Sequence, residues 1–373
     1  MRILHAAETI KGGVATVMRQ LMLAHVNEQD VRGISCLVPA HHRDELPSLG
    51  ADTIHCFERS GRNFISLWRF LTAFVTVVLR ERPDVVHLHS SFAGVVGRLC
   101  LLPLAVVVRP KVVYCPHAFP FLIKTSKSWL LMYRTVENLL AFFTDVIICV
   151  SQHERELALR AGLKAKKLIL VHNGIQLPKQ LRELRSCEKE SPLQLLFVGR
   201  FDRQKGFDVL LAAMNLLEEY PVELVAVGEP VNGAVAPVPQ KNVRYLGWLD
   251  SESLGPVFAA AHVLVVPSRW EGFAMVPLEG MSYGLPIIAS DCSSLPEVVV
   301  NGVTGCLFPV EDSKALAECI LSRTKEDWIT MGANGSTKFF NEFTASRMTN
   351  STLNIYRSLL GRQVAVYGLS KLS

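Results

Sequence analysis

The chain has 373 residues, of which 49% are hydrophobic and 20% are charged, and its formal net charge is +5. This composition excludes a disordered chain, and the length suits two domains better than one core. The charge is uneven, because residues 1–180 carry 22 Lys and Arg against 13 Asp and Glu, whereas the remainder carries 17 against 21. A basic first half suits an anionic membrane surface, an anionic lipid-linked substrate or a solvated face without a partner.

The nine cysteines are scattered, and no two of them have Cys-x-x-Cys spacing. Most lie in apolar runs, where a free thiol behaves as a small hydrophobe. We therefore expect a reducing compartment, with neither a disulfide framework nor a zinc site. The apolar run before Glu8 is too short for a signal peptide, and the apolar stretch 99–108 is about half of what a bilayer requires. These features predict a cytoplasmic protein, either soluble or peripheral at the inner face of the cell membrane.

Short β-branched runs alternate with helical patterns, which indicates parallel sheets covered by helices. In the first half the expected strands are 2–6, 33–38, 85–89, 112–115 and 146–150, and the helices include 14–25, 63–81 and 128–143. In the second half the expected strands are 194–198, 223–227, 243–246, 263–266 and 286–289, and the helices include 207–219, 251–260 and 277–283. The predicted fold is α/β, with two doubly wound, Rossmann-like domains facing each other across a cleft.

The predicted boundary between the domains lies in residues 178–192, which are polar and charged and lack strand periodicity. An N-terminal domain would then cover residues 1–177, and a C-terminal domain would cover residues 193–344. A last helical segment, residues 345–373, would return to the first domain or stand apart from it.

Two glutamates stand out in the segment 268–290, SRWEGFAMVPLEGMSYGLPIIAS. A helix is expected to start near Pro277, so that Glu271 lies in a loop and Glu279 lies in the helix. A carboxylate near a helix N-terminus and a phosphate-binding loop is well placed to bind a ribose diol. The alternative is a structural role without a ligand, in which Glu271 is a surface acid and Glu279 complements the helix N-terminus. The loop residues whose backbone N–H groups could meet ligand hydroxyls are Gly272, Phe273 and Ala274.

A second informative segment is LLFVGRFDRQKGFDVLLAA, residues 195–213, which reads as a strand, a polar loop and a helix. The loop contains Gly199, and its cations Arg200 and Lys205 lie at the carboxyl edge of the expected sheet. Two cations beside loop amides form a binding site for a diphosphate without a metal ion. The alternative is a solvated charged turn without a ligand. The presence of Glu271 and Glu279 in the same domain weakens this alternative.

The patterns VGR-x4-KG, EGFA-x4-E and ASDCSSLPEVVVNGVTGCLFP are found together in the second half. The first half adds an opening Gly-Gly loop, HLHSSFAG, YCPHAF, CVSQHERE and VHNGI. With these motifs the chain resembles the family-four retaining glycosyltransferases of the GT-B architecture, also called glycosyl transferases group 1, over nearly its whole length. The resemblance implies an acceptor-side N-terminal domain and a C-terminal domain that binds a nucleotide-sugar.

The resemblance also implies roles for individual residues. Arg200 and Lys205 would bind the donor diphosphate, and Glu279 would hold the ribose hydroxyls. Glu271 would contact the sugar ring together with loop amides, and His117 would face the donor sugar from the first domain. The full donor-binding set implied in this way is Gly12, Gly13, Gly199, Arg200, Lys205, Gly272, Phe273, Ala274, Met275 and Glu279. At Ala274 the family often has glycine, and this departure bears on which sugar fits.

The function implied is transfer of a sugar from a UDP- or GDP-sugar, with retention, to a glycan or lipid-linked glycan in bacterial surface polysaccharide synthesis. A nucleotide-sugar 2-epimerase and a catalytically silent binding subunit are the alternatives. The nucleotide-sugar is a substrate, and neither a metal nor another cofactor is expected. His87 and His89 alternate along a strand, where a polar pair at the strand end is expected in preference to metal ligands. The lysines at 164, 166 and 167 precede a further expected strand at 168–171 and read as a solubilising run, so a nucleic-acid partner is not expected.

Overall fold

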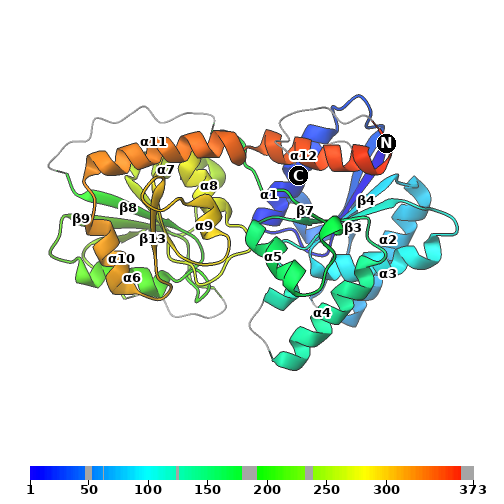
Figure 1. The fold of residues 1–373 in the computed structure, drawn as a ribbon, viewed down its shortest axis with the longest axis horizontal. Coiled ribbons are helices and arrows are strands. Elements are labelled where there is room, and N and C mark those ends of the chain that lie inside the picture. Colours follow the sequence, from blue (N-terminus) through cyan, green and yellow to red (C-terminus); the bar gives the residue numbers. More distant parts are fainter. Residues whose placement is uncertain (47–52, 62, 123–125, 179–190, 232–237, 363–373) are drawn as a thin grey trace. The chain divides into compact units, whose positions relative to one another are not determined.

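The computed structural model describes residues 1–46, 53–61, 63–122, 126–178, 191–231 and 238–362. The chain divides into two compact units, seen in Figure 1: unit 1 combines Met1–Gly174 with the segment that starts at Ala345, and unit 2 is Ile175–Thr344. The segment that the sequence sets apart at residue 345 thus lies in unit 1. Most of the expected linker, residues 178–192, lies outside the described residues.

Unit 1 is built on a seven-stranded parallel sheet in the order β3-β2-β1-β4-β5-β6-β7. The strands are β1 (Arg2–Ala7), β2 (Gly33–Pro39), β3 (Ile54–Phe57), β4 (Val85–His89), β5 (Lys111–Cys115), β6 (Val146–Cys149) and β7 (Leu168–Leu170). The helices are α1 (Gly13–His25), α2 (Phe64–Glu81), α3 (Ser91–Leu104), α4 (Lys127–Ala141), α5 (Gln152–Arg160) and α12 (Ala345–Leu359). The strand order reverses between β1 and β4, which makes this pair the switch point where such sheets bind ligands.

Unit 2 has a six-stranded parallel sheet in the order β10-β9-β8-β11-β12-β13. The strands are β8 (Leu193–Val198), β9 (Val222–Val227), β10 (Val243–Tyr245), β11 (Val263–Val266), β12 (Ile287–Ser290) and β13 (Gly305–Phe308). The helices are α6 (Phe207–Leu216), α7 (Ser251–Ala260), α8 (Met275–Ser282), α9 (Leu295–Val298), α10 (Ser313–Leu321) and α11 (Lys325–Glu342). The predicted fold class, two doubly wound α/β units, is confirmed.

Two strands, β3 and β13, were not predicted from the sequence. Both contain four residues and lie at an edge of their sheets. A strand this short is recognisable when it forms a continuous β-branched run, as β11 does, whereas β3 and β13 lack such a run and are defined by their pairing with β2 and β12. Their existence therefore follows from tertiary pairing.

Helix α12 completes unit 1 by packing against α1. The guanidinium of Arg357 binds Glu28 at 3.0 Å and Asp30 at 2.7 Å. On the buried side, Nε2 of His25 lies 2.9 Å from the carbonyl oxygen of Thr349. These contacts explain why α12 belongs to unit 1, although the whole of unit 2 lies between α12 and the rest of unit 1 in the sequence.

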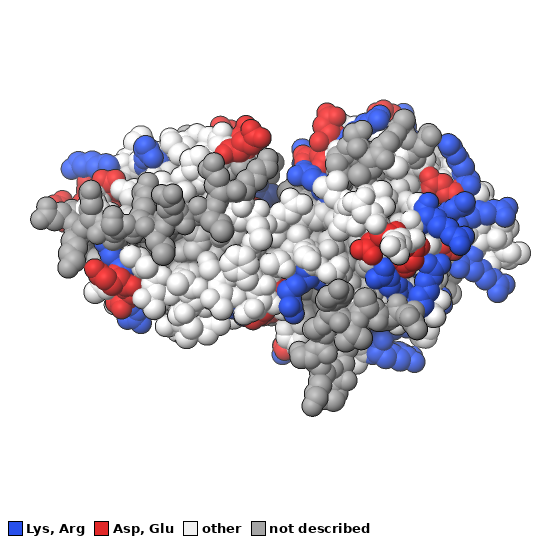
Figure 2. All heavy atoms as spheres, turned by 90° about the horizontal axis from the view of Figure 1, so that it is seen from above, with Lys and Arg blue, Asp and Glu red and all other residues white. Residues whose placement is uncertain are grey.

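The surface of unit 1 reflects its basic composition. Figure 2 shows Lys and Arg side chains gathered on the face of unit 1 that is turned to the viewer. Among the helices that the structure describes, none combines the length and the apolar character required to cross a bilayer.

Candidate functional site

In unit 2 the two motif-bearing loops leave the carboxyl ends of neighbouring strands. Residues 199–206 connect β8 to α6, and residues 267–274 connect β11 to α8. Because β8 pairs with β11 at the position where the strand order reverses, both loops lie at the switch point of the sheet. This is the edge at which doubly wound folds bind ligands.

Hydrogen bonds lock these two loops together. The backbone N–H of Arg269 donates to the carbonyl of Gln204 at 2.8 Å, and the Gln204 amide donates to the carbonyl of Trp270 at 3.2 Å. The guanidinium of Arg269 also binds both carboxylate oxygens of Asp208 at 2.8 Å. Such a bidentate pair fixes orientation as well as distance. The loops therefore behave as one preorganised element.

The same contact requires glycine at position 206. Its φ is +66°, and a Cβ there would lie 1.9 Å from the carbonyl oxygen of Pro267. Any side chain would push the two loops apart, in addition to the strain of a left-handed backbone. Gly206 thus sets how closely the loop of residues 199–206 approaches the loop of residues 267–274.

Lys205 and Glu271 meet across the two loops. The Lys205 ammonium lies 2.6 Å from Oε1 of Glu271, and the hydroxyl of Ser268 donates to the same oxygen at 2.6 Å. The Glu271 side chain is only 6% exposed. Burial of a carboxylate is tolerated when it is paired and hydrogen-bonded in this way. Ser268 was not predicted as a site residue, although its place two residues after the end of β11 was a usable signal.

Arg200 presents the second cation of the site. Its Nε lies 3.0 Å from Asp202, and one terminal nitrogen donates to Gln204 at 3.0 Å. The side chain remains 47% exposed, so the guanidinium is accessible to a ligand. A planar guanidinium held from one side is suited to a phosphate group.

Helix α8 carries Glu279 and starts at Met275, two residues before the predicted start at Pro277. Proline at the third helical position is tolerated because the first N–H groups of a helix have no intrahelical partner. Ala274 is the N-cap residue with φ −70°, a conformation that does not require glycine. The departure from the family pattern at this position is therefore free of backbone strain.

Glu279 lies one turn into α8, and its carboxyl group is largely buried. Burial raises its pKa to about 6, and the charge of Lys205 partly offsets this rise. Carboxylates are costly to bury without donors, so this group is suited to accepting hydrogen bonds from ligand hydroxyls. The structure brings Gly199, Arg200, Lys205, residues 271–275 and Glu279 to one edge of unit 2.

In unit 1 the predicted glycine loop follows β1. Gly12 has φ +59° and is the N-cap residue of α1, and its carbonyl accepts a hydrogen bond from the N–H of Thr16 at 3.1 Å. Gly13 is the first residue of the helix. Position 12 requires glycine conformationally, and its ideal Cβ would meet no atom within 4 Å. The open space is consistent with a helix N-terminus that a ligand can approach.

Strained backbone is concentrated in the loops after β4 and β5. Ser90 has φ +72°, His117 has φ +55° and Ala118 has φ +127°. The N–H of Ser90 donates to the carbonyl of Cys115 at 3.0 Å, so these loops are joined. Non-glycine residues in such conformations persist where the surroundings hold them, and they are often found at functional sites. His117, predicted from its motif, lies in the most strained segment of this sheet edge.

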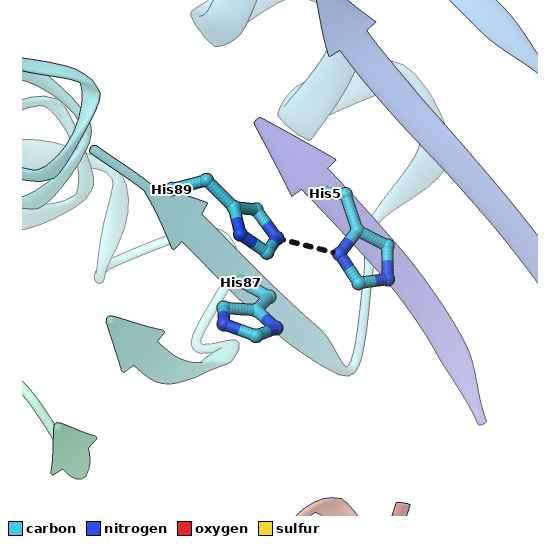
Figure 3. Close-up of side chains that lie close together, drawn as sticks. All are labelled: His5, His87 and His89. Atoms are coloured by element: carbon cyan, nitrogen blue, oxygen red, sulfur yellow. Dashed lines mark hydrogen bonds between the residues drawn. The ribbon is translucent and has the colours of Figure 1, made fainter. Parts of the chain in front are cut away.

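His117 is the half-buried outer neighbour of a cluster of buried histidines. Figure 3 shows His5, His87 and His89 projecting from β1 and β4 toward one another. The register explains the cluster, because His5 pairs with His87 on the adjacent strand, so their side chains share one face of the sheet. The predicted polar pair is thus part of a larger group. His5 was missed because it carries no motif, and only strand pairing brings it beside the other two.

Comparison with known proteins agrees with this architecture. Residues 192–325 match the family "Glycosyl transferases group 1", and residues 11–178 match "Glycosyltransferase Family 4". A Klebsiella pneumoniae protein, an uncharacterized 41.2 kDa protein in a cps region, is 35% identical over 370 residues, which is 96% of this chain and all of that protein. The Escherichia coli UDP-Gal:alpha-D-GlcNAc-diphosphoundecaprenol alpha-1,3-galactosyltransferase is 26% identical over 79% of each chain.

The fold is also found in solved structures. The Anabaena protein HepE, crystallised in complex with UDP, superposes with a TM-score of 0.74 at 19% identity, covering 96% of this chain and 100% of that chain. The two family matches, the relatives and the pair of doubly wound sheets lead to one conclusion: the chain belongs to the family-four, group 1 glycosyltransferases with the GT-B fold, and it is a glycosyltransferase.

Proposed function

We propose that this glycosyltransferase uses a nucleoside-diphosphate sugar as donor, binds it at the switch point of unit 2, and transfers the sugar with retention. The observation that carries the proposal is that two cations and Glu271, on loops that hydrogen bonds hold together, lie at the same sheet edge as Glu279 of α8. The E. coli relative is named for UDP-Gal, and HepE was crystallised with UDP, which supports a UDP-sugar as the first donor to test.

Each residue then has a task set by its chemistry. Arg200 and Lys205 bind the diphosphate, where both cations stabilise the negative charge that grows on the leaving nucleotide. Glu279 accepts hydrogen bonds from the ribose hydroxyls. Glu271, held by Lys205 and Ser268, orients a sugar hydroxyl together with the amides at the start of α8. The imidazole of His117 contacts the sugar.

Retention requires the acceptor to enter on the face from which the nucleotide leaves, unless an enzyme nucleophile acts first. We propose the front-face route, in which the sugar passes through an oxocarbenium-like state and the departing diphosphate accepts the acceptor proton. On this route the protein contributes positioning and charge stabilisation.

Calorimetric titration with UDP-glucose, UDP-galactose and GDP-mannose tests the donor site directly. We expect one of these donors to bind with a stoichiometry of one and the Arg200→Ala variant to bind it at least tenfold more weakly. Absence of binding by all three would support a silent subunit. Epimerised sugar formed without an acceptor would support a 2-epimerase instead.

We further propose that the acceptor is lipid-linked and that unit 1 meets an anionic membrane through the surface of α4. Large apolar side chains are exposed on α4 and just after it, namely Trp129, Leu131, Leu139, Phe142 and Phe143. Cations accompany them, since the Lys164 ammonium lies 5.3 Å from the centre of the Phe142 ring. A surface that combines exposed aromatic and basic residues is suited to the interface of an anionic bilayer.

Liposome flotation tests this surface. We expect the protein to float with vesicles of phosphatidylcholine and phosphatidylglycerol and to stay behind with phosphatidylcholine alone. The double variant Trp129→Ser, Leu131→Ser should lose flotation, whereas Trp248→Ser, a change at a half-exposed tryptophan of unit 2, should keep it. Equal recovery of wild type and double variant in the floating fraction would contradict the proposal.

A further inference from the structure

Three histidine rings of unit 1 are joined end to end. Nε2 of His117 lies 3.0 Å from Nδ1 of His89, and Nε2 of His89 lies 3.0 Å from Nδ1 of His5. The ring centres are 5.3 Å and 5.2 Å apart, and the ring planes differ by only 18° and 26°. Nitrogens in contact between nearly coplanar rings place each lone pair opposite an N–H, which is the geometry of a hydrogen bond. His5, His89 and His117 are hereafter the imidazole chain.

His5, His87 and His89 bring one ring nitrogen each within 4.8 Å of one another, but the orientation of the rings does not suit a shared metal ion. A metal ion lies in the ring plane of each imidazole that binds it, because the nitrogen lone pair lies in that plane. His87 and His89 stack face to face, with ring centres 4.0 Å apart and planes 29° from parallel. Their lone pairs therefore lie in two stacked, nearly parallel planes, so one ion does not lie in the planes of both rings. The nitrogens of His5 and His89 that come closest already face each other.

At pH 7 burial favours the neutral form of all three rings of the imidazole chain. Burial lowers the pKa of His5 to about 3 and that of His117 to about 4, and it lowers the pKa of His89 well below its usual value. The titratable groups around the chain are neutral as well: His25 on α1, His87 on β4, Cys115 on β5 and Tyr356 on α12. A neutral imidazole has one donor and one acceptor, so the chain has only two arrangements, one in each direction.

The buried end of the chain favours one direction. Nε2 of His5 is buried and has no hydrogen-bond partner among the described residues. If the protons point toward His117, this nitrogen is an unpaired acceptor; in the opposite direction it is an unpaired N–H. Buried backbone N–H groups without a partner are rarer than under-satisfied carbonyls, and we extend that ordering to the ring. The favoured arrangement puts a proton on Nδ1 of all three rings.

We infer that His5 and His89 are positioning residues, which hold the ring of His117 and fix its tautomer so that Nδ1–H is offered as a donor to an oxygen of the bound substrate. The final clause rests on the proposed function, in which His117 contacts the sugar. Among the described residues, Nδ1 of His117 makes no hydrogen bond, which leaves it available for this contact. The strained backbone of His117, with φ +55°, adds a second constraint on the ring.

Long-range 1H–15N correlation on protein labelled with 15N-histidine measures tautomer and charge without substrate. His117 is assigned by the loss of its signals in His117→Gln. We expect a single Nδ1–H tautomer for His117, unchanged between about pH 5.5 and 8. The Nε2–H tautomer, an even mixture or a positive charge at pH 7 would overturn the inference, and the tautomer itself is read on the wild-type protein.

Two variants separate positioning from general packing. His89→Phe removes both hydrogen bonds, so His117 should become a mixture of tautomers, and kcat should fall on the order of tenfold, as for partners that orient other imidazoles. His89→Asn places an amide near the position of Nδ1 and should recover most of the single tautomer. His87→Phe is the matched control: His87 has the same strand and burial, but its Nδ1 binds the Tyr356 hydroxyl at 2.6 Å, so His117 should be unaffected.

The outcomes are distinguishable from failure of the proposed function. If the wild-type protein binds no nucleotide-sugar but shows the expected tautomer, the positioning role of His5 and His89 is supported and the proposed function fails. If wild type turns over and His89→Phe leaves the His117 signals unchanged, the inference fails alone. Stoichiometric Zn²⁺ in protein purified without a histidine tag, lost in His5→Phe, would also overturn it.

Discussion

The ammonium of Lys205 and the carboxylate of Glu271 are in contact at 2.6 Å, although 66 positions separate them in the sequence. The pair joins the loop after β8 to the loop after β11 and leaves each charge compensated before any ligand arrives. A lysine held in this way is already directed at the site, so less side-chain freedom is lost when a diphosphate binds.

Replacing Lys205 by alanine should lower kcat on the order of 100- to 1000-fold, because one cation is removed where negative charge develops on the leaving group. Initial rates of donor turnover measure the effect. Lys241→Ala is the control, since Lys241 is 87% exposed and pairs with Glu218 on the surface of the same unit. Turnover of the Lys205 variant within a few-fold of wild type would exclude a role in charge stabilisation.

Glu279 should make donor affinity depend on pH. Its pKa of about 6 in the folded protein lies above the usual 4.5, so the carboxylate that accepts ribose hydroxyls is lost as the pH falls through 6. Donor affinity should therefore decrease between about pH 7 and 5, as titration calorimetry at several pH values measures. In Glu279→Gln the affinity should be lower and its pH dependence over this range reduced. An unchanged pH profile in this variant would assign the effect to another group.

The same raised pKa predicts an effect of opposite sign on stability. Below pH 4.5 Glu279 is protonated in both the folded and the unfolded states and does not affect stability. The cost of ionising it in the folded state grows between pH 4.5 and 6 and is complete above pH 6. Glu279→Gln should therefore stabilise the ligand-free protein above pH 6 by up to about 2 kcal/mol and have little effect at pH 4.5. Urea unfolding of the wild type and the variant at pH 8 and at pH 4.5 measures the difference. A variant that is less stable than the wild type at pH 8 would contradict the assignment.

A buried ion pair in unit 1 should be sensitive to loss of one partner. Arg98 and Glu137 are 2.9 Å apart and almost fully buried, and the Tyr114 hydroxyl donates to the other carboxylate oxygen at 3.1 Å. Glu137→Ala leaves an uncompensated guanidinium and should cost about 3–5 kcal/mol of unfolding free energy. The double variant Arg98→Met, Glu137→Leu should recover most of it. Thermal unfolding followed by circular dichroism checks this, and a double variant as unstable as the single one would contradict the argument.

The attachment of α12 should depend on Arg357. Arg357 is 15% exposed and binds both Glu28 and Asp30, and this contact holds the pKa of Asp30 below its usual value. Arg357→Ala should cost on the order of 1 kcal/mol. The Asp30 contribution is present above pH 3.8 and disappears as the pH falls through its lower folded pKa. Arg160→Ala, at a site 74% exposed, is the control, and equal unfolding midpoints for the two variants at pH 7 would contradict the prediction.

Much of the architecture was readable from the sequence, because parallel strands buried on both faces form continuous β-branched runs between helical patterns. The strands that flank the site, β8 and β11, fall where those runs predict them. The segments that carry Arg200 and Glu279 were recognisable for a related reason: a loop after such a strand and a helix N-terminus are local features. Helix α8 begins two residues before the predicted start. Proline is accommodated at any of the first positions of a helix, so Pro277 did not mark one exact first residue.

The sequence by itself determined the fold class, the family and the loops that carry the site's charges, because each depends on residues close together in the chain. Only the tertiary structure decided which side chains meet. Lys205 binds Glu271 because β8 pairs with β11, and His5 joins His89 because β1 pairs with β4. Strand order is set by packing across the whole sheet, so no local pattern specifies it. That is why His5 had no visible role in the sequence.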